Sequence, residues 1–397
     1  PTDYFVSCLN GTLIHLGDDE VTEFVSWQNQ VCCGDPEYLE YKLRIMGLSL
    51  SMFNFDRSFY MPLGPIGRNG KGSESHLFNV VTMSLTPSRG YYMSREYLTK
   101  SGQDRKGANA ADTVMTDLAN KAVIIADECR DVPLDGPLIK ALVSGDRQSG
   151  RNLYEAERTN VSNRGKLWII ANKTPKLDYG DPALMDRCRV LPYNARWVRN
   201  PAEVIASMTD INQKLWVFQD NPYFKEKTLD TWGNAMVTKC LYALHLFFKS
   251  LPRDPENPTR PAKLESIPVP ACVKTATKFT IEREHPVMGF LNNFMGHEDS
   301  GNVADYVTVE HAFAQFQRFG KNENSKKLTC MNRVSFQEAL EKENIEVMQD
   351  SESVYRFKCW KMIKDVPSND ASSGPVAMDG SFYIPPPALK RRREDDD

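Results

Sequence analysis

Residues 64–73 carry the side chains whose types and spacing suit phosphate chemistry. An apolar run, residues 59–63, leads into the sequence GPIGRNGKGS, and a helical pattern follows. Glycines let a backbone come close to phosphate oxygens, and the N–H groups at a helix N-terminus attract anions. Lys71 would reach the outer phosphates of a nucleoside triphosphate. We therefore predict contacts from Gly67, Arg68, Asn69, Gly70, Lys71, Gly72 and Ser73.

This phosphate loop (residues 64–73) departs from the strict pattern G-x-x-x-x-G-K-[ST] at two positions. Pro65 stands where the pattern has its first glycine, and Gly72 replaces the Ser or Thr whose hydroxyl binds Mg²⁺. Ser73 is one residue late, so it would bind the metal only if the loop shifts; otherwise water would take that position. The alternative interpretation is a structural glycine turn with an incidental lysine.

Polar side chains follow two further apolar runs. Asp127 and Glu128 come directly after residues 122–126, and Asn172 follows residues 167–171. Ligands of open α/β sheets bind at the carboxyl ends of the strands, so these side chains should meet the phosphate loop. We expect Asp127 to orient Mg²⁺ and Glu128 to polarise the attacking water, while Asn172 contacts the γ-phosphate or that water. Each segment taken alone also fits an ordinary polar strand end.

Two arginines precede the next apolar run. Asp181 and Pro182 are typical of the start of a short helix, which leads to Arg187 and Arg189 before residues 190–193. An arginine at this place could reach the nucleotide of a neighbouring subunit. A solvated arginine is the commoner explanation for either one alone.

The elements that position these side chains form an α/β pattern. Residues 19–50 repeat apolar side chains at helical spacing and break at residues 34–36, which predicts two helices with a packing role only. Residues 53–195 alternate short apolar runs with helical patterns, as in a mostly parallel sheet covered by helices. Another helix is expected over residues 228–248. The proline-rich residues 252–270 are interpreted as a domain boundary.

The C-terminal part of the chain suggests a winged helix. Helical patterns in residues 308–343 are followed by two short apolar runs, residues 345–348 and 354–360, that suggest a hairpin. Duplex DNA contact would then involve Arg333, Gln337, Arg356 and Lys358. A packing role fits equally well. Residues 366–397 are rich in Pro, Ser and Asp and are expected to be a disordered tail.

Composition narrows the class of protein. The chain has 397 residues, 41% hydrophobic and 25% charged, which excludes a largely disordered or fibrous protein and predicts at least two folded units. A net charge of −3 means that any nucleic-acid surface must be a local patch. The nine cysteines form no zinc-binding spacing, and their odd number suggests a reducing compartment. No apolar run approaches the roughly 18 residues of a membrane span.

In this order, the motifs resemble the superfamily 3 helicase module of poxvirus-type primase-helicases. The resemblance rests on the phosphate loop, IIADE at residues 124–128, the block at residues 138–154, Asn172 with Pro175, and Asp181 with Arg187. It covers residues 20–195 by specific motifs and residues 196–365 by general pattern. It implies an AAA+-like core, hexameric rings around DNA, ATP at subunit interfaces and 3′ to 5′ translocation. It further implies that Asn172 is a sensor and Arg187 a finger acting in trans.

The resemblance also assigns DNA contacts. Residues 145–166 have an excess of basic side chains, and in the family this stretch forms a hairpin that projects into the ring channel. The candidate contacts are Arg147, Arg151, Arg158 and Arg164. Without the resemblance, an ordinary solvated loop would be the favoured interpretation.

The expected order of regions follows from these patterns. They are a helical, collar-like region (1–52), an AAA+-like core with a parallel sheet (53–200), a helical segment packed on it (201–250), a linker (251–270), a winged-helix-like domain (271–365) and the tail (366–397). Because the chain starts without Met inside patterned sequence, we expect it to be the C-terminal part of a longer polypeptide with a primase domain upstream.

We expect an ATP-dependent hexameric replicative DNA helicase that uses ATP and Mg²⁺ on single- and double-stranded DNA. It would act with other viral replication proteins in a host cell, at a virus replication site that we expect to be cytoplasmic, neither secreted nor bound to a membrane. The alternative is a catalytically weak, ring-forming scaffold or initiator. A GTPase-like switch is disfavoured by the absence of a guanine-specifying motif and by the acidic pair Asp127 and Glu128.

Overall fold

The computed structural model of the chain has two units. The described residues are 18–64, 67–83, 89–99, 113–127, 129, 133–150, 159–177, 181–227, 232–257, 261–263, 265–284, 286–297, 303–322, 330–342, 345–363 and 365–366. The first unit ends at Thr277 and the second begins at Lys278. Among the described residues, no helix combines the length and the apolar character that a membrane crossing requires.

A five-stranded sheet organises the first unit. Its strand order is β2-β3-β6-β1-β7, and every pair of neighbours is parallel. The strands are Gly90–Tyr92 (β2), Val123–Ala126 (β3), Lys166–Ile169 (β6), Phe59–Leu63 (β1) and Cys188–Pro192 (β7). This confirms the predicted α/β class with a parallel sheet. The short strand β2 was not predicted, because three residues carry too little pattern to be recognised.

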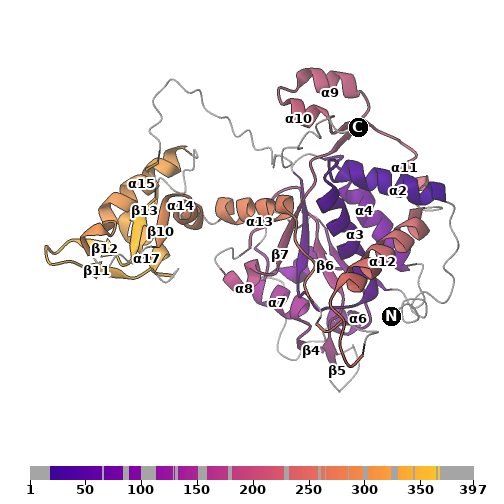
Figure 1. The fold of residues 1–397 in the computed structure, drawn as a ribbon, viewed down its shortest axis with the longest axis horizontal. Coiled ribbons are helices and arrows are strands. Elements are labelled where there is room, and N and C mark those ends of the chain that lie inside the picture. Colours follow the sequence, from indigo (N-terminus) through magenta and orange to yellow (C-terminus); the bar gives the residue numbers. More distant parts are fainter. Residues whose placement is uncertain are drawn as a thin grey trace. The chain divides into compact units, whose positions relative to one another are not determined.

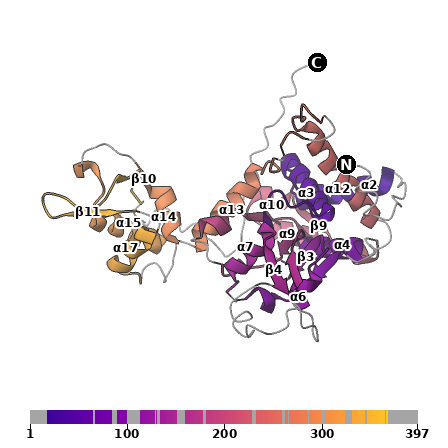
Figure 2. The same cartoon turned by 90° about the horizontal axis from the view of Figure 1, so that it is seen from below.

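Helices cover both faces of this sheet. On one face, α2 (Asp18–Val31), α3 (Pro36–Ser51), α4 (Lys71–Met83) and α12 (Gly233–Ser250) pack together, and α7 (Gly136–Ser144) and α8 (Pro182–Met185) lie on the other (Figures 1 and 2). The predicted break between the first two helices is present. The Asp35 carboxylate accepts a hydrogen bond of 3.0 Å from the Tyr38 N–H, which caps α3.

Shorter elements complete the first unit. They are η1 (Arg95–Leu98), α6 (Thr113–Asp117), β4 (Arg147–Gly150), β5 (Thr159–Ser162), β8 (Arg196–Val198), α9 (Pro201–Ser207), α10 (Ile211–Lys214), β9 (Val217–Gln219) and α11 (Phe224–Lys227). Strands β4 and β5 form an antiparallel hairpin, whereas β8 and β9 pair in parallel.

A buried carboxylate joins the helices on one face of the sheet. Glu74 of α4 pairs with Lys42 of α3 at 2.6 Å, and neither side chain exceeds 3% exposure. The Tyr193 hydroxyl donates to Glu74 Oε1 at 2.5 Å, and Gln28 Nε2 of α2 donates to Oε2 at 3.3 Å. The ammonium of Lys42 also lies 4.3 Å from the centre of the Tyr193 ring. These four residues, the Glu74 cluster, connect three helices to the residue that follows β7.

A second buried ion pair lies at the amino end of β6. The Lys166 ammonium contacts the Asp56 carboxylate and donates to Asn54 Oδ1 at 2.8 Å. Burial lowers the pKa of Lys166, against the opposing effect of Asp56. Lys166 is therefore a structural cation, and it does not belong to the exposed basic surface of residues 145–166.

The proline-rich stretch packs on the first unit. Leu251 and Ile267 are buried in its core, and the Ala262 N–H donates to the Pro252 carbonyl at 2.8 Å. The division between units, which the sequence placed at residues 251–270, falls seven residues later, inside α13 (Ala271–Glu284). Prolines prevent regular structure here, but they leave the apolar side chains between them free to pack.

The second unit is built around phenylalanines. Phe290, Phe316, Phe336 and Phe357 are completely buried. Its elements are α14 (Pro286–Phe294), β10 (Met295–His297), η3 (Val303–Asp305), α15 (Val309–Asn322), α17 (Arg333–Lys342), β11 (Val347–Gln349), β12 (Tyr355–Phe357) and β13 (Trp360–Met362). Strands β11 and β12 form the predicted hairpin. The predicted tail, apart from residue 366, lies outside the described residues.

Each side chain proposed for duplex contact in the second unit has an acidic partner. The pairs are Arg333 with Glu310 (3.0 Å), Gln337 with Glu341 (2.9 Å), Arg356 with Asp350 (2.7 Å) and Lys358 with Glu346 (2.8 Å). These carboxylates offset the positive charge that phosphate binding would need. Duplex contact by these four residues stays a prediction.

Replacing Glu74 by alanine should lower the free energy of unfolding by about 3–5 kcal/mol, because it leaves Lys42 as an unpaired buried charge. Urea titration followed by tryptophan fluorescence measures this change. Glu40→Ala is the matched control, since it removes the exposed partner of Arg44 in α3 and should cost under about 1 kcal/mol. Equal losses in the two variants would contradict a structural role for the cluster.

Candidate functional site

The carboxyl edge of the sheet collects the predicted site residues. Strands β3, β6 and β1 are parallel neighbours, so the residues that follow them emerge side by side. Asp127 follows β3, Asn172 lies just after β6, and the phosphate loop follows β1. An isolated bridge between Leu63 and Ala171 brings the last two together. Asp127 and Asn172 are both exposed at this edge.

Close packing sets the shape of the phosphate loop. A Cβ on Gly64 would lie 2.4 Å from Asn69 Nδ2 and 2.5 Å from the Tyr193 carbonyl oxygen, so only glycine fits there. Asn69 is buried, and its amide donates to the carbonyls of Gly64 and Tyr193 at 3.4 Å each. Gly64 thus provides the close approach that Pro65, standing at the pattern's glycine position, cannot.

The second half of the loop uses unusual backbone angles. Gly70 has φ of 88° and Arg68 has φ of 61°. The Trp197 N–H donates to the Arg68 carbonyl at 2.8 Å, and the Glu74 N–H donates to the Gly70 carbonyl at 3.0 Å. These bonds hold the loop against β8 and begin α4 at Lys71. The N-terminus of α4 therefore points its free N–H groups toward the loop.

Lys71 is the cation of this site. It is 4% exposed, and its ammonium donates to the Gly64 carbonyl at 2.7 Å. Burial lowers the pKa of Lys71 to about 8, while the negative charge of Asp127 acts in the opposite direction. The lysine is thus folded back on the start of its own loop. A bound phosphate would stabilise its charged form.

Free space surrounds Gly72, the residue at which the strict pattern has the metal-binding hydroxyl. A Cβ built on Gly72 meets no atom within 4 Å, so a serine would fit there without rearrangement. Ser73 lines a cavity on the α2 side of the loop. Glu128 lies outside the described residues, and Asp127 is exposed after β3, where its charge acts on Lys71. Among the described residues, no three or more His, Cys, Asp or Glu side chains lie close enough together to hold a metal ion.

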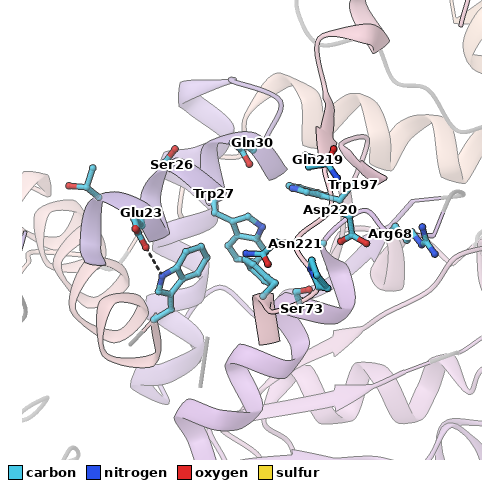
Figure 3. A pocket seen from close by; sticks show the side chains of 15 residues that line it. Glu23, Ser26, Trp27, Gln30, Arg68, Ser73, Trp197, Gln219, Asp220 and Asn221 are labelled. Atoms are coloured by element: carbon cyan, nitrogen blue, oxygen red, sulfur yellow. Dashed lines mark hydrogen bonds between the residues drawn. The ribbon is translucent and has the colours of Figure 1, made fainter. Parts of the chain in front are cut away.

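A cavity of about 720 Å³ adjoins the phosphate loop (Figure 3). One wall is α2, and the facing wall is formed by β8, β9 and the residues that follow β9. The cavity is lined by Thr22, Glu23, Ser26, Trp27, Gln30, Arg68, Gly70, Ser73, Trp197, Gln219, Asp220, Asn221, Pro222, Phe224 and Trp232. Sequence reasoning missed it, since it assigned α2 a packing role only. The available signal was the polar face of α2 around Trp27.

The predicted arginines lie elsewhere. Arg187 directly precedes β7, so it belongs to the amino edge of the sheet, away from its own phosphate loop. Its guanidinium donates to the Ala183 carbonyl, and its Nε is buried with no hydrogen-bond partner among the described residues. Arg147 begins β4, and Arg164 precedes β6; both are exposed. Arg151 and Arg158 lie outside the described residues.

Comparison with known proteins gives only distant similarities. No protein family matches the sequence, and neither does any curated protein. The chain is similar to the apo A-form structure of the NrS-1 C-terminal region (residues 305–718), with a TM-score of 0.44 and 10% identity over 87% of this chain and 76% of that chain. A second A-form structure of that region gives a TM-score of 0.41 and 11% identity, covering 87% and 77% of the two chains.

A JCV helicase with a small molecule bound gives a TM-score of 0.34 and 10% identity, covering 73% of this chain and 70% of that chain. Similarities of this size do not assign an activity to the chain. Its functional interpretation depends on the geometry of the site.

Proposed function

We propose that the chain binds ATP on the phosphate loop and hydrolyses it to move on DNA, as a superfamily 3 helicase module would. The observation that supports this is the meeting of Lys71, Asp127 and Asn172 with the N-terminus of α4 at one edge of a parallel sheet. This edge is where open α/β sheets bind ligands.

Each residue has a distinct part in this proposal. The N–H groups of α4 and the Lys71 ammonium bind the β- and γ-phosphates. Mg²⁺ bound with the nucleotide would neutralise charge on the phosphates, and Asp127 would hold it. Asn172 orients the γ-phosphate or the attacking water, and Glu128 is the proposed base.

The remaining features of the proposal concern assembly. We propose homo-hexameric AAA+-like rings in which Arg187 reaches the nucleotide of the next subunit, which its position at the opposite edge of the sheet favours. Arg147 and Arg164 would contact DNA, together with Arg151 and Arg158. The poxvirus-type relationship, the upstream primase domain, the viral partners and the cytoplasmic replication site belong to the same proposal.

One observation favours the second candidate function. Gly72 has no hydroxyl for the metal, so a ring-forming scaffold that binds nucleotide and DNA with weak hydrolysis also fits the site. Particle mass and DNA-stimulated hydrolysis separate the two functions. A ring that binds nucleotide without DNA-stimulated turnover would support the scaffold.

Lys71→Ala should reduce DNA-stimulated ATP hydrolysis at least about 10² to 10³-fold, because it removes the cation that neutralises charge in the transition state. Phosphate release measures the rate. Lys249→Ala, which changes an exposed lysine at the end of α12, is the matched control and should keep the wild-type rate. Undiminished turnover in Lys71→Ala would place the catalytic site elsewhere.

Nucleotide binding should take up a proton above about pH 8, because the pKa of Lys71 is lowered to about 8 by burial and phosphate favours its charged form. Below that pH the lysine is already charged, so affinity should be independent of its titration. Above it, affinity should fall by up to about tenfold per pH unit. Calorimetry in two buffers of different ionisation enthalpy measures the uptake at about pH 9. Lys71→Arg should abolish it, and equal uptake in that variant would contradict the assignment.

Gly72→Ser should lower the Mg²⁺ concentration needed for half-maximal hydrolysis several-fold, since the open position accepts a side chain whose hydroxyl binds the metal. Gly72→Ala is the matched control, because it adds the Cβ without the hydroxyl. A magnesium titration of hydrolysis compares the two variants. The same Mg²⁺ requirement in both would show that the hydroxyl is not the missing element.

A further inference from the structure

The cavity beside the phosphate loop extends the site beyond the phosphates. Arg68, Gly70 and Ser73 contribute to its wall, so it opens at the place where phosphates would bind. The other lining residues come from α2 and from residues 197–232, which lie outside the core motifs. A volume of about 720 Å³ is within the range of small-molecule sites.

Tryptophans form its apolar surface. Trp27 is nearly buried, with ring centres 5.2 Å from Phe224 and 5.6 Å from Trp232. Trp197 packs on the loop itself, because a Cβ on Gly70 would lie 3.4 Å from its Cζ3. Rings held in this way lose little freedom when a flat ligand stacks on them. An aromatic wall that starts at the phosphate loop suits a nucleobase.

Two amides present complementary groups at the rim. Gln219 Nε2 donates to the Arg199 carbonyl at 2.9 Å, which leaves its Oε1 as an acceptor. Asn221 Oδ1 accepts from the Tyr223 N–H at 3.0 Å, which leaves its Nδ2 as a donor. Base edges carry donors beside acceptors, so one acceptor at the end of β9 and one donor two residues later can pair with such an edge.

Charged side chains on opposite sides of the cavity determine which end of a nucleotide would lie on each side. Arg68 and Glu23 lie on opposite sides of the cavity, as Figure 3 shows. The Glu23 carboxylate lies 3.4 Å from Trp232 Nε1, at the wall formed by α2. Phosphates are repelled by that carboxylate and attracted by Arg68 and Lys71. A neutral base and sugar can therefore occupy the α2 side while the phosphates occupy the loop.

We propose that this cavity binds the base and sugar of the nucleoside triphosphate, with Trp197 stacking, Trp27 closing the apolar wall, and Gln219 and Asn221 bonding to the base edge. The inference rests on the proposed function, because the phosphate loop must hold the phosphates. It assigns a ligand to α2 and to residues 219–221. Gln28 of α2 belongs to the Glu74 cluster, so the same helix contacts both the base and the core of the loop helix α4.

The test compares a non-hydrolysable ATP analogue with inorganic tripolyphosphate, which lacks base and sugar. Calorimetry should show that the wild-type protein binds the analogue more tightly. Trp197→Leu should weaken binding of the analogue by roughly 5-fold to 150-fold, which is the usual range for a lost base stack. Asn221→Ser keeps an oxygen for the Tyr223 N–H and removes the amide donor, so it should cost about 2-fold to 10-fold.

Asn221→Ser should leave the affinity for tripolyphosphate unchanged, and Trp197→Leu, whose ring packs on the loop, should lower it much less than the affinity for the analogue. Trp216→Leu is the matched control, because Trp216 does not line the cavity, and it should bind both probes as the wild type does. Wild-type affinities that are equal for the two probes, or variants that lose both probes equally, would overturn this inference alone. A wild-type protein that binds neither probe would overturn the proposed function as well.

Discussion

The site depends on the contacts that the buried carboxylate of Glu74 makes with Lys42, Tyr193 and Gln28. A carboxylate inside a protein is costly unless cations and donors surround it, and here Lys42, Tyr193 and Gln28 provide them. Because Glu74 lies one turn into α4, the same contacts fix the helix whose N-terminus bears Lys71. The N-terminal helices therefore contribute electrostatically to the position of the phosphate loop, beyond their apolar packing.

Parallel strands divide the candidate residues between two edges of the sheet. Asp127, Asn172 and the phosphate loop share the carboxyl edge, while Arg187 and Arg164 precede strands and belong to the amino edge. In the proposed ring, Arg187 would serve the nucleotide of the next subunit from the amino edge.

Two segments far apart in the chain complete the proposed nucleotide site. Helix α2 meets Trp197, residues 219–224 and Trp232 around the mouth of the phosphate loop, and these segments bring tryptophans and amides to it. Base binding in this cavity would connect nucleotide occupancy to α2, and through Gln28 to the Glu74 cluster. The helical region before the core, the core and the segment after it thus form one functional unit in the proposal.

Local pattern was sufficient for four of the five strands and for α2 and α3, because buried parallel strands appear as continuous apolar runs and helices repeat at a fixed spacing. The position of Asp127 and Asn172 beside the loop followed from the rule for strand ends. Burial of Lys42 and Glu74 was decided only by the tertiary structure, since in the sequence they are ordinary charged residues of helical patterns. The aromatic cavity likewise depends on contacts between residues that are distant along the chain. Hydrophobic periodicity indicates which side of a segment is buried, and it does not indicate which other segment covers that side.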